Sequence, residues 1–296
     1  MLSEKQINAY KKNGYLVVED VIPPETLKIL QDVTDAFVEG AKNVTEHNET
    51  YDLADDHSKE NPKLRRLKNP HLIHKEYEAL TRDPCILDLV SQLLGNNLRR
   101  DHTKLNFKAA NGGEAIEWHQ DWAFYPHSND DMLAFGVFLE DVTEENGPLM
   151  VIPKSHQGPI LNHFANGVFC GAVDPDDPEF KIEEAVTLTG KAGDMTVHHA
   201  RTLHGSAPNI SSKSRLMLFY ECNAVDAWPL LGAASYIHSL GQKKFWKDLE
   251  ERLITGKLST TPRLTEVPVS IPLPTPEKAG SIFELQKAGG AKSAFK

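Results

Sequence analysis

The chain has 296 residues, of which 40% are hydrophobic and 25% charged, the composition of a globular protein that can bury a sizeable core. Its formal net charge of −10 argues against a nucleic acid or an anionic membrane as the main partner, because both attract basic surfaces. Three widely separated cysteines (Cys85, Cys170 and Cys222) form neither a disulfide framework nor a zinc-ribbon pattern and favour a reducing compartment.

The first hundred residues carry mostly helical patterns. Ser3 is suited to cap a helix that Asn13-Gly14 ends, and Pro23-Pro24 opens a second helix with apolar residues at helical spacing. Residues 43–70 are polar and charged, which predicts a mobile loop. The elements expected here are a helix over 3–12, a strand over 15–20, a helix from 24 and a helix over 86–94.

Short apolar runs separated by glycine, proline and asparagine clusters begin at about residue 98. Many short strands with such punctuation are typical of a β-sandwich or jelly roll. We therefore expect a mainly β fold with flanking helices. The expected strands cover residues 99–108, 133–140, 148–152, 185–188, 194–198 and 215–223.

The segment 118–122 places a histidine and a carboxylate, His119 and Asp121, two positions apart. On an extended strand, residues i and i+2 point to the same face, so both can reach one metal ion. His204 is the best candidate for a third ligand. Two imidazoles and one carboxylate with open positions favour non-haem Fe(II) over structural zinc, which takes four closed ligands. Taken alone, the His-x-Asp pattern also fits a hydrogen-bonded pair at the surface.

Arg215 follows His204 by eleven residues and opens the apolar run 216–220. An arginine on a strand that turns into a metal pocket suits the bidentate capture of a carboxylate. A surface cation at a strand end is the alternative interpretation.

These residues and their flanking segments resemble the phytanoyl-CoA dioxygenase family, a branch of the Fe(II)/2-oxoglutarate oxygenases. The likeness covers residues 5–225, with segments in the family's order at 102–108, 118–122, 145–156 and 204–206. The resemblance implies a double-stranded β-helix core of the jelly-roll, cupin-like type. It also implies Fe(II) as the metal, with 2-oxoglutarate and O2 as co-substrates.

The resemblance also assigns roles to single residues. Arg215 is expected to bind the distal carboxylate of 2-oxoglutarate, and Ser206 to assist it. Gln120, beside the metal ligands, and Lys108, on the first long core strand, are further candidates for contact with the co-substrate. The implied metal ligands, which are also the catalytic residues, are His119, Asp121 and His204.

Aromatic side chains flank the metal-binding motif. Core packing is the alternative interpretation for at least two of them, but those that point inward would line an apolar substrate pocket. The polar residues 144–148 are expected to form a tight turn of the scaffold, because Asn-Gly supplies positive φ angles. The candidates for substrate contact are Trp122, Phe124, Tyr125 and His102.

The expected function is that of an Fe(II)- and 2-oxoglutarate-dependent dioxygenase that hydroxylates an unactivated C–H bond of a small-molecule metabolite, with release of succinate and CO2. Asp121 favours this over halogenation, because halogenase relatives lack the carboxylate. Desaturation, epimerisation or ring formation at the same metal is an alternative, and a non-catalytic binding module on a jelly roll is a third hypothesis. The sequence has no strong basic cluster dedicated to the CoA nucleotide, which favours a substrate without CoA.

No internal repeat or clear linker interrupts the chain, so we expect a single oxygenase domain over 1–296. Within it, 1–97 is the expected helical N-terminal part, 98–225 the jelly-roll core, and 226–296 a C-terminal extension packed on the core. The proline-punctuated residues 262–276 are expected to run extended along the surface.

Targeting signals are not recognisable in the sequence. No apolar run approaches the roughly 18 residues needed to span a bilayer. The start does not resemble a signal peptide, and the end is not a peroxisomal Ser-Lys-Leu tail. We therefore expect a cytoplasmic enzyme with a small-molecule substrate, without a nucleic-acid or membrane partner, and with a homodimer as the candidate assembly.

Overall fold

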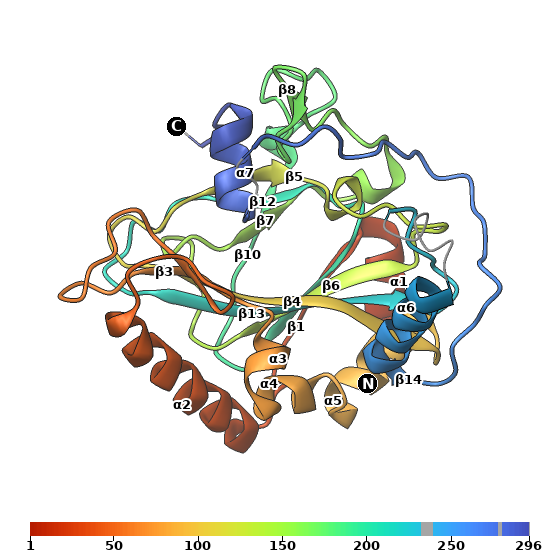
Figure 1. The fold of residues 1–296 in the computed structure, drawn as a ribbon, viewed down its shortest axis with the longest axis horizontal. Helices are drawn as coiled ribbons and strands as arrows, with labels where there is room; N and C mark the ends of the chain where they lie inside the picture. Colours follow the sequence, from red (N-terminus) through yellow and green to blue (C-terminus); the bar gives the residue numbers. More distant parts are fainter. Residues whose placement is uncertain (232–238, 278–279, 296) are drawn as a thin grey trace.

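The strands of the chain form two antiparallel sheets, one large and one small, that face each other across the interior (Figure 1). The structure is a computed structural model and describes residues 1–231, 239–277 and 280–295. In these residues the large sheet has eight strands, in the order β1-β11-β6-β13-β4-β3-β2 with β14 paired to β4, and the small sheet has the order β10-β7-β12-β5. A separate hairpin joins β8 to β9. The strands are β1 (Tyr15–Val18), β2 (Tyr51–Leu53), β3 (Leu64–Lys68), β4 (Leu98–Lys108), β5 (Ile116–His119), β6 (Met132–Phe138), β7 (Leu149–Val151), β8 (Phe164–Ala165), β9 (Val168–Phe169), β10 (Val186–Leu188), β11 (Met195–His199), β12 (His204–Ser206), β13 (Arg215–Ala224) and β14 (Leu253–Thr255).

Helices α2 to α5 cover the outer face of the large sheet (Figure 1). Apolar side chains of this layer, such as Leu30, Tyr77 and Val90, are buried against sheet residues such as Leu105 and Phe135. The inner face of the large sheet is thereby left to the small sheet and to the cavity between the two. The helices are α1 (Glu4–Asn13), α2 (Pro24–Gly40), α3 (Pro70–Ile73), α4 (Lys75–Leu80), α5 (Pro84–Leu94), α6 (Ser239–Arg252) and α7 (Ile282–Gly289).

The expected mainly β fold with a jelly-roll core and flanking helices is confirmed. The ends of the elements expected from local patterns agree with the structure to within two residues, in β4, β6, β7, β10, β11 and β13 among others. Ser3 accepts the predicted capping hydrogen bond from the Gln6 amide of α1, and Gly14 ends that helix at a φ of 83°.

The expectation of a mobile loop over residues 43–70 is wrong, because β2 and β3 lie within this segment and β3 extends the large sheet beside β4. The charged side chains that suggested a loop are paired with one another. Arg65 is buried and lies 2.6 Å from both Asp55 and Glu114, and the Nε atom of Arg66 lies 3.3 Å from the buried Asp52. At Asp52 and Arg65, polarity in the sequence therefore reflects ion pairs formed by buried side chains rather than exposure to solvent.

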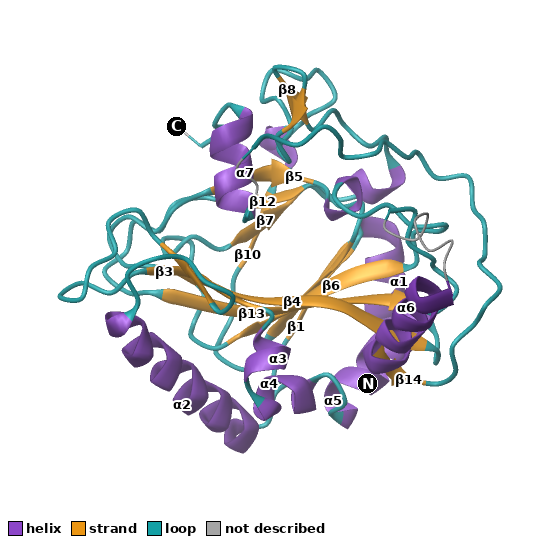
Figure 2. Ribbon diagram, in the orientation of Figure 1, coloured by secondary structure: helices purple, strands orange, loops and turns teal. Residues whose placement is uncertain are grey.

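The C-terminal residues return to the small sheet. Between β14 and α7 the described chain has no regular structure and follows the outside of the fold (Figure 2), as expected for residues 262–276. Helix α7 then lies beside β5, where the side chain of Gln286 accepts a hydrogen bond from the Glu117 amide at 3.1 Å and donates one to the Gly171 carbonyl at 3.0 Å. This contact places α7 over one end of the interior.

The three-part division at residues 97 and 225 stays a prediction. The first part contributes β1, β2 and β3 to the large sheet, and the last part contributes β14.

Among the described residues, no helix combines the length and the apolar character needed to cross a membrane.

Candidate functional site

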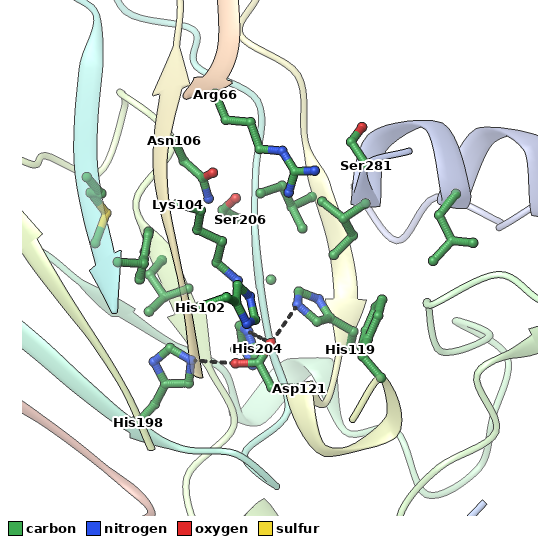
Figure 3. Close-up of a pocket in the computed structure, with 18 of the residues that line it drawn as sticks. Arg66, His102, Lys104, Asn106, His119, Asp121, His198, His204, Ser206 and Ser281 are labelled. Carbon is green, nitrogen blue, oxygen red and sulfur yellow. Dashed lines mark hydrogen bonds and ion pairs between the residues drawn. The ribbon is translucent and has the colours of Figure 1, made fainter. Parts of the chain in front are cut away.

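Three side chains with metal-ligating atoms meet at one end of the small sheet (Figure 3). His119 ends β5 and His204 opens β12, and the two residues pair across these strands. Their Nε2 atoms lie 3.7 and 3.8 Å from Oδ1 of Asp121, and the ligand atoms of all three residues lie within 4.8 Å of one another. Twice a metal–ligand bond of about 2.1 Å exceeds the two His–Asp separations, so an ion between these groups can bind to both imidazoles and the carboxylate.

Asp121 reaches this point from a turn and not from the extended strand that its spacing predicts. It opens a short 3₁₀ helix, Asp121–Ala123, in which the Phe124 amide donates to the Asp121 carbonyl at 2.9 Å. The Trp122 amide donates to the Ala200 carbonyl at 2.8 Å and ties this turn to the end of β11. The prediction of the strand geometry at Asp121 is therefore wrong, although the turn still directs its carboxylate toward His119.

The three candidate ligands have the protonation states that a metal ion requires. Burial lowers the pKa of His119 to about 4 and that of His204 well below its usual value, so both imidazoles are neutral at neutral pH. Burial acts to raise the pKa of Asp121, but the positive charge of Lys104 and the hydrogen bond with His198 act against it, and the pKa lies well below its usual value. Neutral imidazoles and an ionised carboxylate are the forms that bind a divalent cation.

Backbone carbonyls orient both imidazole rings. Nδ1 of His119 donates to the Glu117 carbonyl at 2.8 Å, and Nδ1 of His204 donates to the Thr202 carbonyl at 2.9 Å. Each hydrogen bond leaves the Nε2 lone pair free to point at the metal, which is the usual arrangement around ligating histidines.

His198 supports the carboxylate from the other side. Its Nε2 lies 3.3 Å from Oδ2 of Asp121, while Oδ1 faces the two histidines (Figure 3). His198 is buried on β11, so this hydrogen bond is shielded from water. With Oδ2 held in this way, Asp121 presents one oxygen atom to the metal.

His198→Phe is expected to weaken Fe(II) binding about 10- to 100-fold, the usual cost of removing a hydrogen-bonding partner of a metal ligand. The phenyl ring keeps the bulk of the imidazole but cannot donate to Asp121. Anaerobic titration with Fe(II) measures the effect. His199→Phe is the matched control, because His199 is the next residue of the same strand and lies near Asp130 instead. Equal iron affinity in the two variants would contradict the supporting role of His198.

A cavity of about 250 Å³ extends from this triad between the two sheets. Arg215, at the start of β13, lines it and is almost completely buried. Its Nη2 donates to the Gly147 carbonyl at 2.7 Å, whereas its Nε has no hydrogen-bond partner, and no carboxylate of the described residues forms an ion pair with it. Burial lowers the pKa of Arg215 to about 9, which still leaves it charged at neutral pH.

A buried guanidinium without an anionic partner is costly unless a ligand supplies the charge. The donor set around the cavity fits a dicarboxylate that chelates a metal at one end and meets Arg215 at the other. Ser206 is buried and lines the same cavity as the triad (Figure 3). The residues present therefore fit Fe(II) together with 2-oxoglutarate.

Comparison with known proteins agrees with this arrangement. The profile of the family described as Phytanoyl-CoA dioxygenase (PhyH) matches residues 10–217. The chain belongs to the phytanoyl-CoA dioxygenase family. It is 38% identical over 293 residues to a probable alpha-ketoglutarate-dependent hypophosphite dioxygenase of Stutzerimonas stutzeri, covering 97% of this chain and 98% of that protein.

Two further relatives support the same class. An L-proline trans-4-hydroxylase of Streptomyces griseoviridis is 32% identical over 186 residues, covering 56% of this chain and 69% of that protein. The crystal structure of EctD from S. alaskensis with bound Fe matches with a TM-score of 0.64 and 25% identity, over 76% of this chain and 78% of that one. The chain is thus an Fe(II)- and 2-oxoglutarate-dependent dioxygenase of the phytanoyl-CoA dioxygenase family, as the sequence predicts.

Two residues expected to touch the co-substrate lie outside the cavity in this family member. Gln120 is buried with its amide bonded to the carbonyls of Pro159 and Arg201, at 3.1 and 2.8 Å, so it fastens the turn that carries Asp121. The ammonium group of Lys108 donates to the carbonyls of Ser206 and Ala207 and holds the chain after β12. The expectation for both residues therefore does not agree with their position, because their polar atoms are engaged with the backbone.

Three of the four residues expected to contact the substrate line the cavity, namely Phe124, Tyr125 and His102. Trp122 does not. It is buried beside Met132 and Ala200, and its indole N–H donates to the Pro268 carbonyl at 2.8 Å. Trp122 thus packs the core and anchors the C-terminal extension, which is the alternative interpretation given to these aromatic residues.

Sequence reasoning missed several residues of the cavity. Lys104 and Asn106 alternate with their neighbours on β4 and point to the same face as His102, a signal that the expected strand over 99–108 contained. Arg66 was hidden because β3 was predicted to be a loop. Ile282 and Leu285 of α7 come from outside the matched part of the family, and no local pattern indicates that they return to the site.

Proposed function

We propose that this dioxygenase oxidises a small molecule at an Fe(II) ion held by His119, Asp121 and His204. One observation carries the proposal: the three candidate ligands and the buried Arg215 line the same cavity, in charge states suited to a divalent cation and to a carboxylate. Arg215 and Ser206 are proposed to bind the far carboxylate of 2-oxoglutarate.

Fe(II) with 2-oxoglutarate and O2 supplies the oxidation, in which one oxygen atom enters succinate as CO2 leaves and the other enters the substrate. The chain's own residues position the reactants and exclude water. Leu149, Met217 and Phe219 contribute apolar lining to the cavity, so its charged groups act in surroundings of low polarity.

The size of the cavity supports a small substrate. Ligand pockets usually measure about 300–1,000 Å³, whereas this one measures about 250 Å³ and has to hold 2-oxoglutarate as well. Because the relative from Stutzerimonas stutzeri is named for hypophosphite, hypophosphite is the first substrate to test. Its P–H bond would become P–OH by insertion of the second oxygen atom, whereas a carbon substrate would be hydroxylated at a C–H bond.

An anaerobic titration of the metal-free protein tests the proposal. A visible charge-transfer band is expected only when Fe(II) and 2-oxoglutarate are both present, because the keto acid must reach the metal for the band to form. Exposure to O2 with hypophosphite should then release succinate and phosphite in equal amounts. Tight Fe(II) binding without the band would show that 2-oxoglutarate does not bind at this site. If the band forms but no phosphite is produced, hypophosphite is not the substrate and the proposed co-substrate still stands.

The expected cytoplasmic location, the absence of nucleic-acid and membrane partners, and the homodimer stay predictions. Sedimentation of the purified protein tests the homodimer. The mass of the product separates hydroxylation from desaturation, epimerisation or ring formation.

A further inference from the structure

A second group of charged side chains lies four to six residues further along β4 and β13 from the pair of Arg215 and Lys108. Lys104 and His102 lie on β4, and Glu221 lies on the neighbouring β13. One Glu221 oxygen accepts from Lys104 Nζ at 3.2 Å and lies 2.9 Å from Nε2 of His102. Lys104 and His102 keep 19% and 37% of their side-chain surface exposed, so a ligand in the cavity can reach them.

Strand geometry separates this group from the expected co-substrate end. Arg215 pairs with Lys108 across β13 and β4, whereas Lys104 pairs with Phe219, four residues further along. At about 3.4 Å per residue, this spacing is about 14 Å. Arg215 and Lys104 therefore enter the cavity from different points along the strands.

Within the described residues, the two cations Lys104 and His102 share one close carboxylate, that of Glu221. Arg66 pairs with Asp52, and Arg252 is shared between Asp101 at 2.7 Å and Asp248 at 2.9 Å. An Fe(II) ion with Asp121, Arg215 and a 2-oxoglutarate dianion is neutral as a set, so the co-substrate does not supply a second anion to Lys104 and His102.

Lys104 and His102, which share the Glu221 carboxylate, are both charged at neutral pH. Burial acts to lower the pKa of Lys104 and of His102, but in each case neighbouring acids outweigh it. Glu221 and Asp121 raise the pKa of Lys104, and Glu221 with Asp101 raises that of His102 to about 9. The cluster of Asp101, His102 and Glu221 is for the same reason an ion-pair network and not a second metal site, although its ligand atoms lie within 4.8 Å of one another.

Tyr125 supplies a further donor. Its hydroxyl is buried close to the Glu221 carboxylate, and its side chain lines the cavity. The ring of His102 packs edge-on against that of Tyr125, with the centroids 5.5 Å apart, which fixes both beside Lys104. An ammonium group, an imidazolium and a hydroxyl thus share one carboxylate, and an anionic ligand in the cavity would give these donors a second acceptor.

We infer that Lys104, with His102 and Tyr125, binds the substrate of this enzyme as a small anion beside the metal. The inference rests on the proposed function, since the metal and 2-oxoglutarate account for the remaining charges. Ile282 and Leu285 of α7 line the same cavity, and its volume of about 250 Å³ limits the anion to a small one.

Anaerobic calorimetry of the Fe(II)–2-oxoglutarate enzyme tests the inference with sodium hypophosphite, acetate and acetamide as probes. Acetate and acetamide have nearly the same shape and differ by one charge. Both anions are expected to bind at least about tenfold more tightly than acetamide, as charge-assisted hydrogen bonds are stronger than neutral ones. Lys104→Met should weaken the binding of both anions about 10- to 100-fold and leave the titration midpoint for 2-oxoglutarate unchanged.

Lys28→Met is the matched control, because Lys28 is an exposed lysine of α2 and its loss changes the net charge equally. His102→Gln is a second variant should Lys104→Met not fold, and it is expected to weaken anion binding in the same direction. Equal binding of acetate and acetamide, or unchanged hypophosphite affinity in the folded cavity variants, would overturn the inference. A loss of 2-oxoglutarate affinity in Lys104→Met would overturn it too, by assigning Lys104 to the co-substrate. If the charge-transfer band does not form in the unmodified enzyme, the proposed function itself is wrong.

Discussion

Asp121→Ala is expected to abolish the turnover of 2-oxoglutarate together with Fe(II) binding. Asp121 is the anionic member of the candidate triad, and its two partners, His119 and His204, are neutral. Replacing a residue that only supports a ligand costs about 10- to 100-fold in metal affinity or activity. The loss of the ligand should therefore cost at least about 1,000-fold, measured as succinate release and as iron retained after anaerobic dialysis.

Asp141→Ala is the control for this variant, because Asp141 is an exposed aspartate that pairs with Lys191 far from the cavity. It should bind iron and release succinate like the unmodified enzyme. Thermal unfolding of both metal-free variants checks that the fold is retained. Succinate release by a folded Asp121→Ala variant at the normal rate would remove Asp121 from the metal site.

Arg215→Met should raise the KM for 2-oxoglutarate about 100- to 5,000-fold, since breaking a buried ion pair costs about 3–5 kcal/mol. The turnover number at saturating 2-oxoglutarate should fall much less, because Arg215 lies at the far end of the cavity from the metal ligands. Steady-state succinate release over a range of 2-oxoglutarate concentrations separates the two parameters. Lys213→Met, two residues away on the exposed loop before β13, is the matched control.

Arg215→Met should, by contrast, stabilise the folded protein when no ligand is bound. Burial lowers the pKa of Arg215 to about 9, below its usual value, so the folded protein holds this charge less favourably than the unfolded chain does. This destabilisation of the folded state is present at neutral pH and is lost as the pH rises above about 9. Arg215→Met should therefore raise the melting temperature of the ligand-free enzyme at pH 7, and a lower melting temperature would show that Arg215 stabilises the fold itself.

The fold was predictable where the local signals and the tertiary environment agree. Each strand from β4 onward that carries an apolar run between glycine or proline turns was expected from the sequence, as were the capped helices α1 and α5. The hairpin of β2 and β3 was not, because Arg65, Arg66 and Asp52 are polar in the sequence but paired in the interior. A pattern of hydrophobicity cannot distinguish a solvated charge from one that meets its partner across a sheet.

The candidate site was predictable to the same extent. Residue types and spacing were enough to select His119, Asp121, His204 and Arg215, because few arrangements other than a metal site with an anionic ligand use this combination. Spacing did not predict that Asp121 sits on a turn. It also did not separate Gln120, whose amide holds two carbonyls, from residues that face the cavity.

The sequence by itself determined the class of the fold, the metal-binding motif and the arginine that follows it, because these depend on residue identity and on distances along the chain. Only the tertiary structure decided which charges meet around the cavity. Lys104, His102 and Glu221 come from two strands more than a hundred residues apart, and Ile282 and Leu285 return from the end of the chain. The character of a binding cavity depends on the sum of charges and on the enclosed volume, and both exist only once distant segments have packed together.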